Sequence, residues 1–277
     1  MTNYLNQKGQ ALLIVVLAMV VALTVGLAVV SRSITNLRNS QQEISSQQAL
    51  SAAEAGVNQI IENGANIATG SFFTTTSYTT SLATVSGATA FLLNGNNKIS
   101  QDDATYIWLT PYSFDSSKLF RDTDNVGHNL RWNSTLNIYW GNSATACNNA
   151  ALEIAILYGS RATPLISRFA YDPCSNRKAA NNFSQPTSVS YSISNINLYN
   201  EVSIPITNGF LARVTPLYAD SYVGASSSDL VNHPLPSQGN IIISTGTTGS
   251  NVKRKLNVFQ GYPEVPAELF PFTIFWP

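Results

Sequence analysis

The sequence predicts an α+β protein in which one long N-terminal helix packs, along its C-terminal half, on an antiparallel β-sheet or β-sandwich domain. Residues 11–30 form an unbroken run without a charge. Apolar residues continue at helical spacing to about residue 62, and no proline occurs before Pro111. Farther on, short β-branched and aromatic runs alternate with Gly, Pro, Asn and Asp, a pattern typical of antiparallel strands.

The uncharged run has the length of a membrane span. Twenty helical residues rise about 30 Å, the hydrocarbon thickness of a bilayer. A secretory signal would have a shorter apolar region followed by a small-residue cleavage site, and residues 29–33 offer no such pattern. A buried helix of a soluble protein rarely runs this long without a polar face. We therefore expect a retained span at about residues 11–31.

The helical pattern does not stop where the apolar run ends. Spacings of three, four and seven link apolar residues among Gln, Ser, Asn and Glu, and they are clearest from Leu50 onward. Asn63-Gly64 then supplies a C-terminal stop. The sequence predicts one helix over residues 10–62, about 80 Å long. Its first half is apolar all round, and the stripe Leu50, Val57 and Ile61 would face the sheet.

The orientation of the span follows from the size of its flanks. Lys8 precedes the span while Arg32 and Arg38 follow it, so the distribution of positive charges does not decide. Long domains translocate largely regardless of charge. We expect a single pass through the cytoplasmic (inner) membrane, with the N-terminus inside and the large C-terminal part outside.

The N-terminus resembles a known leader. Lys8-Gly9-Gln10 before the apolar helix looks like the type III prepilin leader of type IV pilins and pseudopilins, and residues 49–58, ALSAAEAGVN, resemble the A-A-E-A-G stretch of PilX-type minor pilins. The resemblance extends from the N-terminus to about Glu62 and is faint afterwards, around positions 246–259. It implies a leader of residues 1–9, cleavage between Gly9 and Gln10 by a prepilin peptidase, methylation of Gln10, and assembly into a filament with a core of helices.

Two residues depart from the pattern of major pilins. The mature chain would begin with Gln10 where those pilins have Phe, and Ile14 stands at the fifth mature position where they have Glu. In the family this glutamate pairs with the terminal amine of a neighbouring subunit, in a low-dielectric setting where a charge pair counts most. A chain without it resembles the K-type tip pseudopilins. This favours an initiating or tip-proximal minor subunit.

The exported part is predicted from composition and strand signals. Residues 63–100 form a Ser/Thr-rich connector, interpreted as a hairpin or linker, with a glycosylated or adhesive loop as the alternative. Residues 101–277 form a β-rich globular domain without a second helical pattern, and the aromatic tail at 269–276 is interpreted as an edge strand or flap. Strands are expected at residues 104–110, 135–140, 152–158, 165–171, 189–193, 210–217, 241–244 and 252–259.

The chain has two cysteines, Cys147 and Cys174. In an oxidising compartment we expect them to pair, with two unpaired buried thiols as the alternative. A bridge closing a loop of this size would stabilise the fold by about 3–4 kcal/mol on the chain-entropy model.

No pattern for catalysis or for a cofactor stands out. No G-x-S-x-G elbow occurs, and His128 and His233 have no patterned nucleophile near them. Residues 121–127 offer Asp and Asn oxygens with a glycine, as calcium loops do, but they lack the terminal Glu of an EF-hand. We interpret them as an Asx-turn loop and predict no metal site. Residues 246–253 lack the Gly-Lys-Ser/Thr ending of a phosphate loop and are expected to form a hairpin turn.

The charge balance also limits the possible partners. The chain has 15 Lys+Arg and 15 Asp+Glu among 277 residues, so its net charge is zero. It lacks the excess of positive charge that is typical of proteins that bind nucleic acid. The leading hypothesis is a structural minor pilin or pseudopilin of a type IV pilus or related secretion filament, and not an enzyme. Its expected partners are other pilin subunits, the prepilin peptidase, the assembly platform and the lipid bilayer. The alternatives are an anchored surface adhesin that does not polymerise and an anchored envelope hydrolase.

Overall fold

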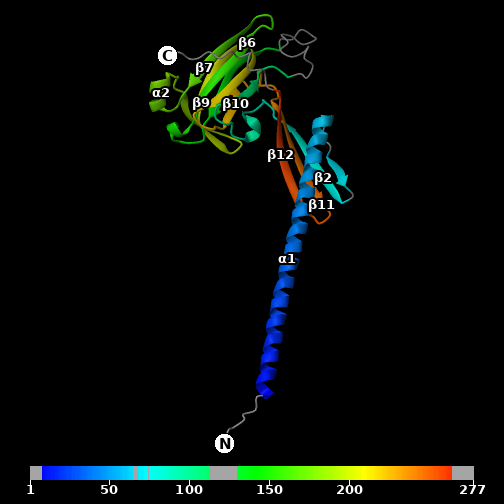
Figure 1. Ribbon diagram of the computed structural model, residues 1–277. Coiled ribbons are helices and arrows are strands. Elements are labelled where there is room, and N and C mark those ends of the chain that lie inside the picture. Colours follow the sequence, from blue (N-terminus) through cyan, green and yellow to red (C-terminus); the bar gives the residue numbers. More distant parts are fainter. Residues whose placement is uncertain (1–7, 65–67, 74, 113–129, 264–277) are drawn as a thin grey trace. The chain divides into compact units, whose positions relative to one another are not determined.

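The computed structural model describes residues 8–64, 68–73, 75–112 and 130–263, with side chains from Leu12 onward. The predicted α+β class is confirmed, because one long N-terminal helix is followed by antiparallel β-sheets (Figure 1). The chain divides into two compact units, Met1–Ser81 with Ile243–Leu256, and Leu82–Ile242 with Asn257–Pro277. The division falls within three strands.

The first unit contains the long helix and most of a four-stranded sheet. The strand order is β1-β2-β11-β12. The bounds are α1 (Lys8–Asn63), β1 (Thr69–Phe73), β2 (Thr76–Thr84), β11 (Gly239–Thr248) and β12 (Lys253–Gly261). Residues of the predicted connector form the antiparallel β1–β2 hairpin, with Thr69 opposite Thr79. Two strands from near the end of the chain, β11 and β12, join this hairpin and complete the sheet.

The second unit is built on an eight-stranded sheet. Its strands follow the order β3-β10-β5-β9-β6-β7, with β4 and β8 also paired to β9. The bounds are β3 (Phe91–Leu92), η1 (Asn94–Asn96), β4 (Thr105–Trp108), β5 (Trp132–Trp140), η2 (Ala146–Asn148), β6 (Ala151–Gly159), β7 (Pro164–Tyr171), α2 (Ser175–Asn181), β8 (Thr187–Ile193), β9 (Ile196–Leu217) and β10 (Val223–Ser227).

Strand β9 organises this sheet because it runs for 22 residues and pairs with four other strands. Its alternating residues are buried from Leu198 to Ile206, as expected for a strand with one face on a core. The pairing with β5 and with β6 shifts register near Gly209. A Cβ there would lie 2.6 Å from Ile206 Cγ2 and 2.7 Å from Leu109 Cδ1. The glycine therefore lets the strand bend at a bulge.

The main core lies on one face of this sheet. It is lined by large side chains that are fully buried, including Trp140, Leu136, Ile138, Leu152 and Ile154. Trp140 Nε1 donates a hydrogen bond to Ala150 O over 2.9 Å, so its one polar atom is satisfied inside the core.

Each of the eight predicted strand segments overlaps a strand of the structure. The sequence missed β3 and β10, the first half of β9, and the helix α2. The sequence showed no second helical pattern, because the seven residues of α2 have no apolar periodicity that could reveal this helix. The possible calcium loop at 121–127, His128 and the tail at 269–276 lie outside the described residues.

Candidate membrane and assembly helix

Helix α1 runs without interruption for 56 residues, which corresponds to about 84 Å. It ends where the sequence predicted. Asn63 is the last helical residue, and Gly64 adopts a left-handed backbone with φ 65°. The Gly64 N–H donates to Ile60 O over 2.8 Å, and Asn63 Nδ2 donates to Gln59 O over 2.8 Å. These bonds satisfy carbonyls that would otherwise be left open at the helix end.

The first part of α1 is not covered by the described parts of the protein. Its large apolar side chains between Leu12 and Val30 are each 53–72% exposed. Leaving them in water would cost on the order of 20 kcal/mol, given about 1.5–3 kcal/mol for each fully buried side chain. The helix is long and apolar enough to cross a membrane, and no part of its most apolar segment is buried by the described residues. Contact with lipid or with other apolar helices would remove this cost.

The polar side chain inside this segment is satisfied within the helix. Thr24 Oγ1 donates to Val21 O over 2.8 Å. In hydrocarbon a hydroxyl without a partner costs several kcal/mol, and this bond removes that cost. Gly26 has no atom within 4 Å of where a Cβ would lie, so the helix surface is open at that point.

The C-terminal half of α1 packs on the sheet through small residues. Ala49, Ala52 and Ala53 are fully buried, and Ile60 is 1% exposed. Gly56 is also buried on this face. The spacings of three and four place these side chains on one side of the helix. We call this set, Ala49, Ala52, Ala53, Gly56 and Ile60, the seam.

Two glycines explain why most of the seam consists of small residues. A Cβ on Gly246 of β11 would overlap the Ala49 carbonyl oxygen and lie 2.7 Å from the Ala53 nitrogen, so the sheet touches the backbone of the helix. A Cβ on Gly56 would lie 2.5 Å from Ser244 Oγ and 2.9 Å from Tyr78 Cδ2. Helix and strand therefore approach each other more closely than larger residues would permit.

Polar contacts border the seam. Arg254 Nε donates to Ser46 Oγ over 2.7 Å, and Ser250 Oγ donates to Ser45 Oγ over 3.2 Å. Ser244 Oγ is buried and has no hydrogen-bond partner in the described structure. The attachment of α1 to its sheet is therefore mainly a matter of apolar contact and close packing.

Gly9 and Gln10 lie in the first turns of α1, and Ile14 is 63% exposed. Of the stripe predicted to face the sheet, Val57 is buried, but Leu50 and Ile61 are 38% and 47% exposed, so that part of the prediction was wrong. The residues missed were the alanines and Gly56, because sequence reasoning searched for large apolar side chains and the close approach of the sheet requires small ones. The A-A-E-A-G stretch itself was the available signal.

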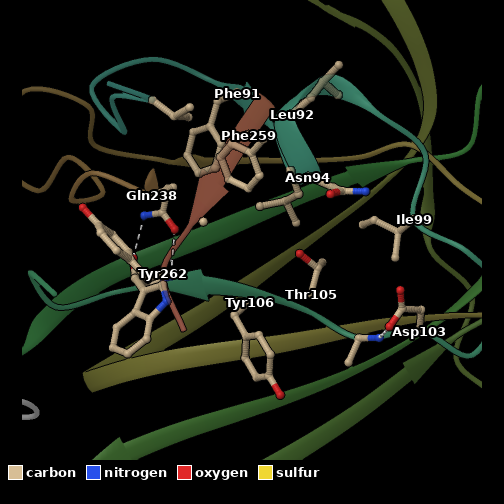
Figure 2. A pocket seen from close by; sticks show the side chains of 15 residues that line it. Phe91, Leu92, Asn94, Ile99, Asp103, Thr105, Tyr106, Gln238, Phe259 and Tyr262 are labelled. Atoms are coloured by element: carbon tan, nitrogen blue, oxygen red, sulfur yellow. Dashed lines mark hydrogen bonds between the residues drawn. The ribbon is translucent and has the colours of Figure 1, made fainter. Parts of the chain in front are cut away.

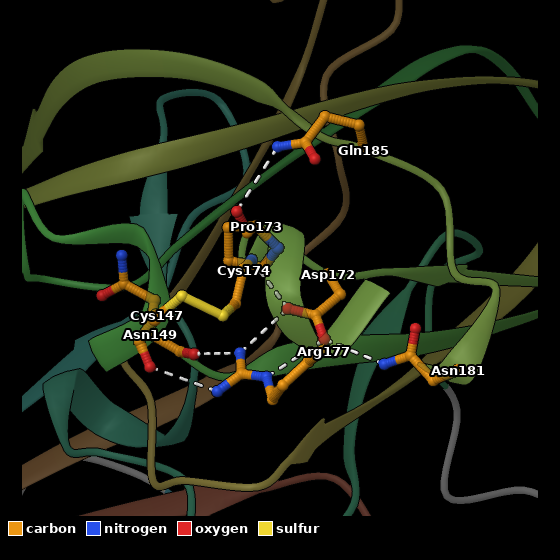
Figure 3. The surroundings of a disulfide bond; sticks show 8 residues. All are labelled: Cys147, Asn149, Asp172, Pro173, Cys174, Arg177, Asn181 and Gln185. Carbon is orange, nitrogen blue, oxygen red and sulfur yellow. Dashed lines mark hydrogen bonds and ion pairs between the residues drawn. A yellow bond between two sulfur atoms is a disulfide. The ribbon is translucent and has the colours of Figure 1, made fainter. Parts of the chain in front are cut away.

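The predicted disulfide between Cys147 and Cys174 is present, and it lies in the second unit beside an ion pair whose Asp172 carboxylate is buried (Figure 3). Arg177 Nη2 lies 2.9 Å from Asp172 Oδ1 and donates to Asn149 O over 2.7 Å. Burial by itself raises the pKa of the fully buried Asp172. Hydrogen bonds from Arg177, from the Cys174 N–H and from Asn181 outweigh burial, so the pKa is lowered overall. The arginine thus joins the same two segments as the disulfide.

His233 belongs to a turn. Its Nδ1 lies 3.1 Å from Asp229 Oδ2, and Asp229 Oδ1 accepts from the Asn232 and Val231 N–H groups over 2.9 and 3.2 Å. Hydrogen bonds from the Asn232 backbone and side chain are the main cause that lowers the pKa of Asp229 to about 2. The pair therefore caps a turn. Among the described residues, no three His, Cys, Asp or Glu side chains gather in a way that could hold a metal ion.

The chain matched no family model, no curated protein and no solved structure.

Proposed function

We propose that this chain is a minor pilin or pseudopilin, a structural subunit that is stored in the cytoplasmic membrane by α1 and then assembled through α1 into a surface filament. The proposal assigns Gly9–Gln10 as the processing site and Gln10 as the methylated terminus. It rests on the resemblance of the leader and of the A-A-E-A-G stretch, together with the form of the helix.

The observation that carries the proposal is the continuity of α1. One unbroken helix connects two segments: an apolar one that the described residues leave uncovered, and one that packs on the four-stranded sheet. A subunit that is pulled out of the bilayer into a filament needs such a rigid connection, because force on the apolar part must reach the exported part without unfolding it. The seam supplies this attachment over about three turns, from Ala49 to Ile60.

The alternative is a surface protein that is anchored by the same span and never polymerises. Such a protein needs a span, but its helix need not continue past Arg38. The continuation of α1 from Asn39 to Asn63, with the seam inside it, favours the filament subunit.

The mass of the N-terminal peptide, measured on protein from cell envelopes, tests the proposal. We expect a chain that begins at methylated Gln10 in cells with an active prepilin peptidase. Gly9→Val should block processing, whereas Gly26→Ala, within the span where a Cβ meets nothing, should leave it intact. A wild-type chain that retains residues 1–9 in those cells contradicts the proposal and favours the non-polymerising anchor.

Filament entry needs a second measurement, since cleavage alone does not show assembly. The protein should appear in the filament fraction sheared from the cell surface, together with other pilin subunits. Processed protein that stays entirely in the membrane fraction, in cells that make filaments, would argue for the anchored surface protein.

A further inference from the structure

A pocket in the second unit has the features of a ligand site. It is a cavity of about 170 Å³ whose walls come from the chain around β3 and η1, from β4 with the turn before it, from Gln238, and from the end of β12 (Figure 2). A cavity of about 150 Å³ holds a molecule the size of benzene, so this one fits a single six-membered ring.

The walls of the pocket are held in place before any ligand arrives. Gln238 is 5% exposed, and its side chain clamps the backbone of Trp108, because Oε1 accepts from Trp108 N and Nε2 donates to Trp108 O, each over 2.8 Å. Gly95, with φ 61°, packs against Phe259, and a Cβ there would lie 2.9 Å from Phe259 Cγ. The flanking Asn94 also has a left-handed backbone. A site fixed in this way loses little entropy on binding.

The two sides of the pocket differ in chemistry. Phe91, Phe259 and Tyr262 lie toward one side, and Asn94, Thr105 and Asp103 lie along the other (Figure 2). The aromatic side is extended by Trp108, whose ring centroid lies 6.0 Å from that of Tyr262. This side of the pocket is therefore lined by aromatic rings.

The polar side has unused hydrogen-bonding capacity. The Thr105 hydroxyl makes no hydrogen bond in the described structure. Asp103 accepts one bond, from the Ala104 N–H to Oδ1 over 2.9 Å, and its second oxygen has no partner among the described residues. Asn94 donates from Nδ2 to Lys98 O over 3.1 Å, which leaves its amide oxygen without a described partner. Two acceptor oxygens, on the exposed Asn94 and Asp103, and the half-buried Thr105 hydroxyl are therefore available to a ligand on this side.

We infer that this pocket binds one pyranose residue of a carbohydrate. A pyranose has a C–H face that stacks on an aromatic ring and hydroxyl edges that donate to carboxylate, amide and hydroxyl oxygens. A few polar groups converging in an otherwise apolar pocket is the usual form of a small-molecule site. An aromatic side chain of a peptide would fill the apolar side but would make no use of the oxygens on the polar side. The inference does not depend on filament assembly.

Saturation-transfer NMR on the full chain, in a detergent without a sugar headgroup, tests the inference. The probes are the methyl β-pyranosides of glucose, galactose and N-acetylglucosamine, with indole as the aromatic comparison. We expect transfer to the ring C–H protons of at least one pyranoside, with a Kd on the order of millimolar for so small a ligand. Transfer to none of the three pyranosides, or to indole alone, overturns the inference.

Variants locate the binding in the pocket. Thr105→Val removes the hydroxyl at nearly constant size and should weaken binding about fivefold, while Phe259→Leu removes the aromatic face and should weaken it about tenfold. Asp103→Asn, at an exposed side chain, serves as a second polar variant if Thr105→Val lowers the unfolding midpoint. Thr187→Val, at an exposed threonine of the same unit, is the matched control and should change nothing. Binding that is unchanged in all three pocket variants overturns the inference.

The length of the carbohydrate distinguishes its source. If the β-1,4-linked tetrasaccharide of the bound sugar binds at least as tightly as the methyl pyranoside, the natural ligand is a polymer. If only the pyranoside binds, the ligand is a free sugar. Both results support a pyranose site.

Discussion

Replacing Gly246 by alanine tests whether the seam holds the long helix on its sheet. In an open strand this change would stabilise the protein by about 0.5–1 kcal/mol, because glycine loses more conformational freedom on folding. Here the new methyl group would overlap the Ala49 carbonyl oxygen and lie 2.7 Å from the Ala53 nitrogen. Both obstacles are backbone atoms, so no rotamer change can relieve them, and the sheet and helix must separate.

The expected magnitude follows from that geometry. Overpacking a tight core costs about 1–3 kcal/mol, and an obstacle that cannot rotate away lies at the upper end of this range. We expect Gly246→Ala to destabilise the attachment of the helix by about 3 kcal/mol. A loss of that size raises the local opening of the helix roughly 100-fold. The exposed fraction of the Ile60 side chain, which is 1% in this structure, should increase as well.

Hydrogen exchange of the amides at residues 49–60, measured by mass spectrometry in detergent micelles, reports this opening directly. The matched control is Gly249→Ala, three positions away, where the new Cβ would lie at an ordinary 3.5 Å from Thr75. That variant should leave the protection of the helix unchanged. If Gly246→Ala also leaves protection unchanged, or raises it as an open strand would, the close-packed seam is not what holds the helix.

The remaining predictions concern the span and the second unit. Val20→Arg places a charge at mid-span at a cost of about 2.5–3.5 kcal/mol and should release protein from carbonate-washed membranes. The control Val231→Arg, at a side chain that is already 87% exposed, should not release it. Equal retention of both variants would argue against a span. Replacing both Cys147 and Cys174 by serine should lower the free energy of unfolding by about 3.5 kcal/mol for a sequence separation of 27, seen as a lower urea midpoint; an unchanged midpoint would mean that other contacts hold the loop. Because the pKa of Asp172 is lowered by folding, its contribution is complete above the unfolded pKa of about 3.9 and is lost as pH falls through the folded value. The urea midpoint should therefore decrease as the pH is lowered below about 4, and it should decrease less steeply in Asp172→Asn. Equal dependence of the midpoint on pH in both proteins would show that this carboxylate plays no part.

The helix could be predicted almost completely because its signals are local. The uncharged run at residues 11–30, apolar spacing at three and four, and the Asn63-Gly64 stop all lie within the element that they describe. The disulfide was also predictable, since two cysteines leave one possible pairing within the chain. The strands at 152–158 and 165–171 were equally visible, because both segments are rich in β-branched and aromatic residues.

Which residues pack on the helix could not be predicted in this way. Leu50 and Ile61 look like core positions by their size, yet they are 38% and 47% exposed, while the alanines and Gly56 are buried. The partner that decides this is Gly246, on a strand near the other end of the chain. A local pattern cannot show that a distant glycine brings the sheet against the helix backbone.

The pocket, likewise, could not be predicted from the sequence. Nothing in the sequence singled out Thr105, Gln238 or Phe259, which come from three separate parts of the chain and meet only in the folded second unit. The sequence by itself determined the apolar span, the long helix, the β-rich remainder and the cysteine pair, because each follows from the periodicity or number of residue types along the chain. Only the tertiary structure decided the seam, the division into units and the pocket, because these depend on contacts between residues that are far apart in sequence.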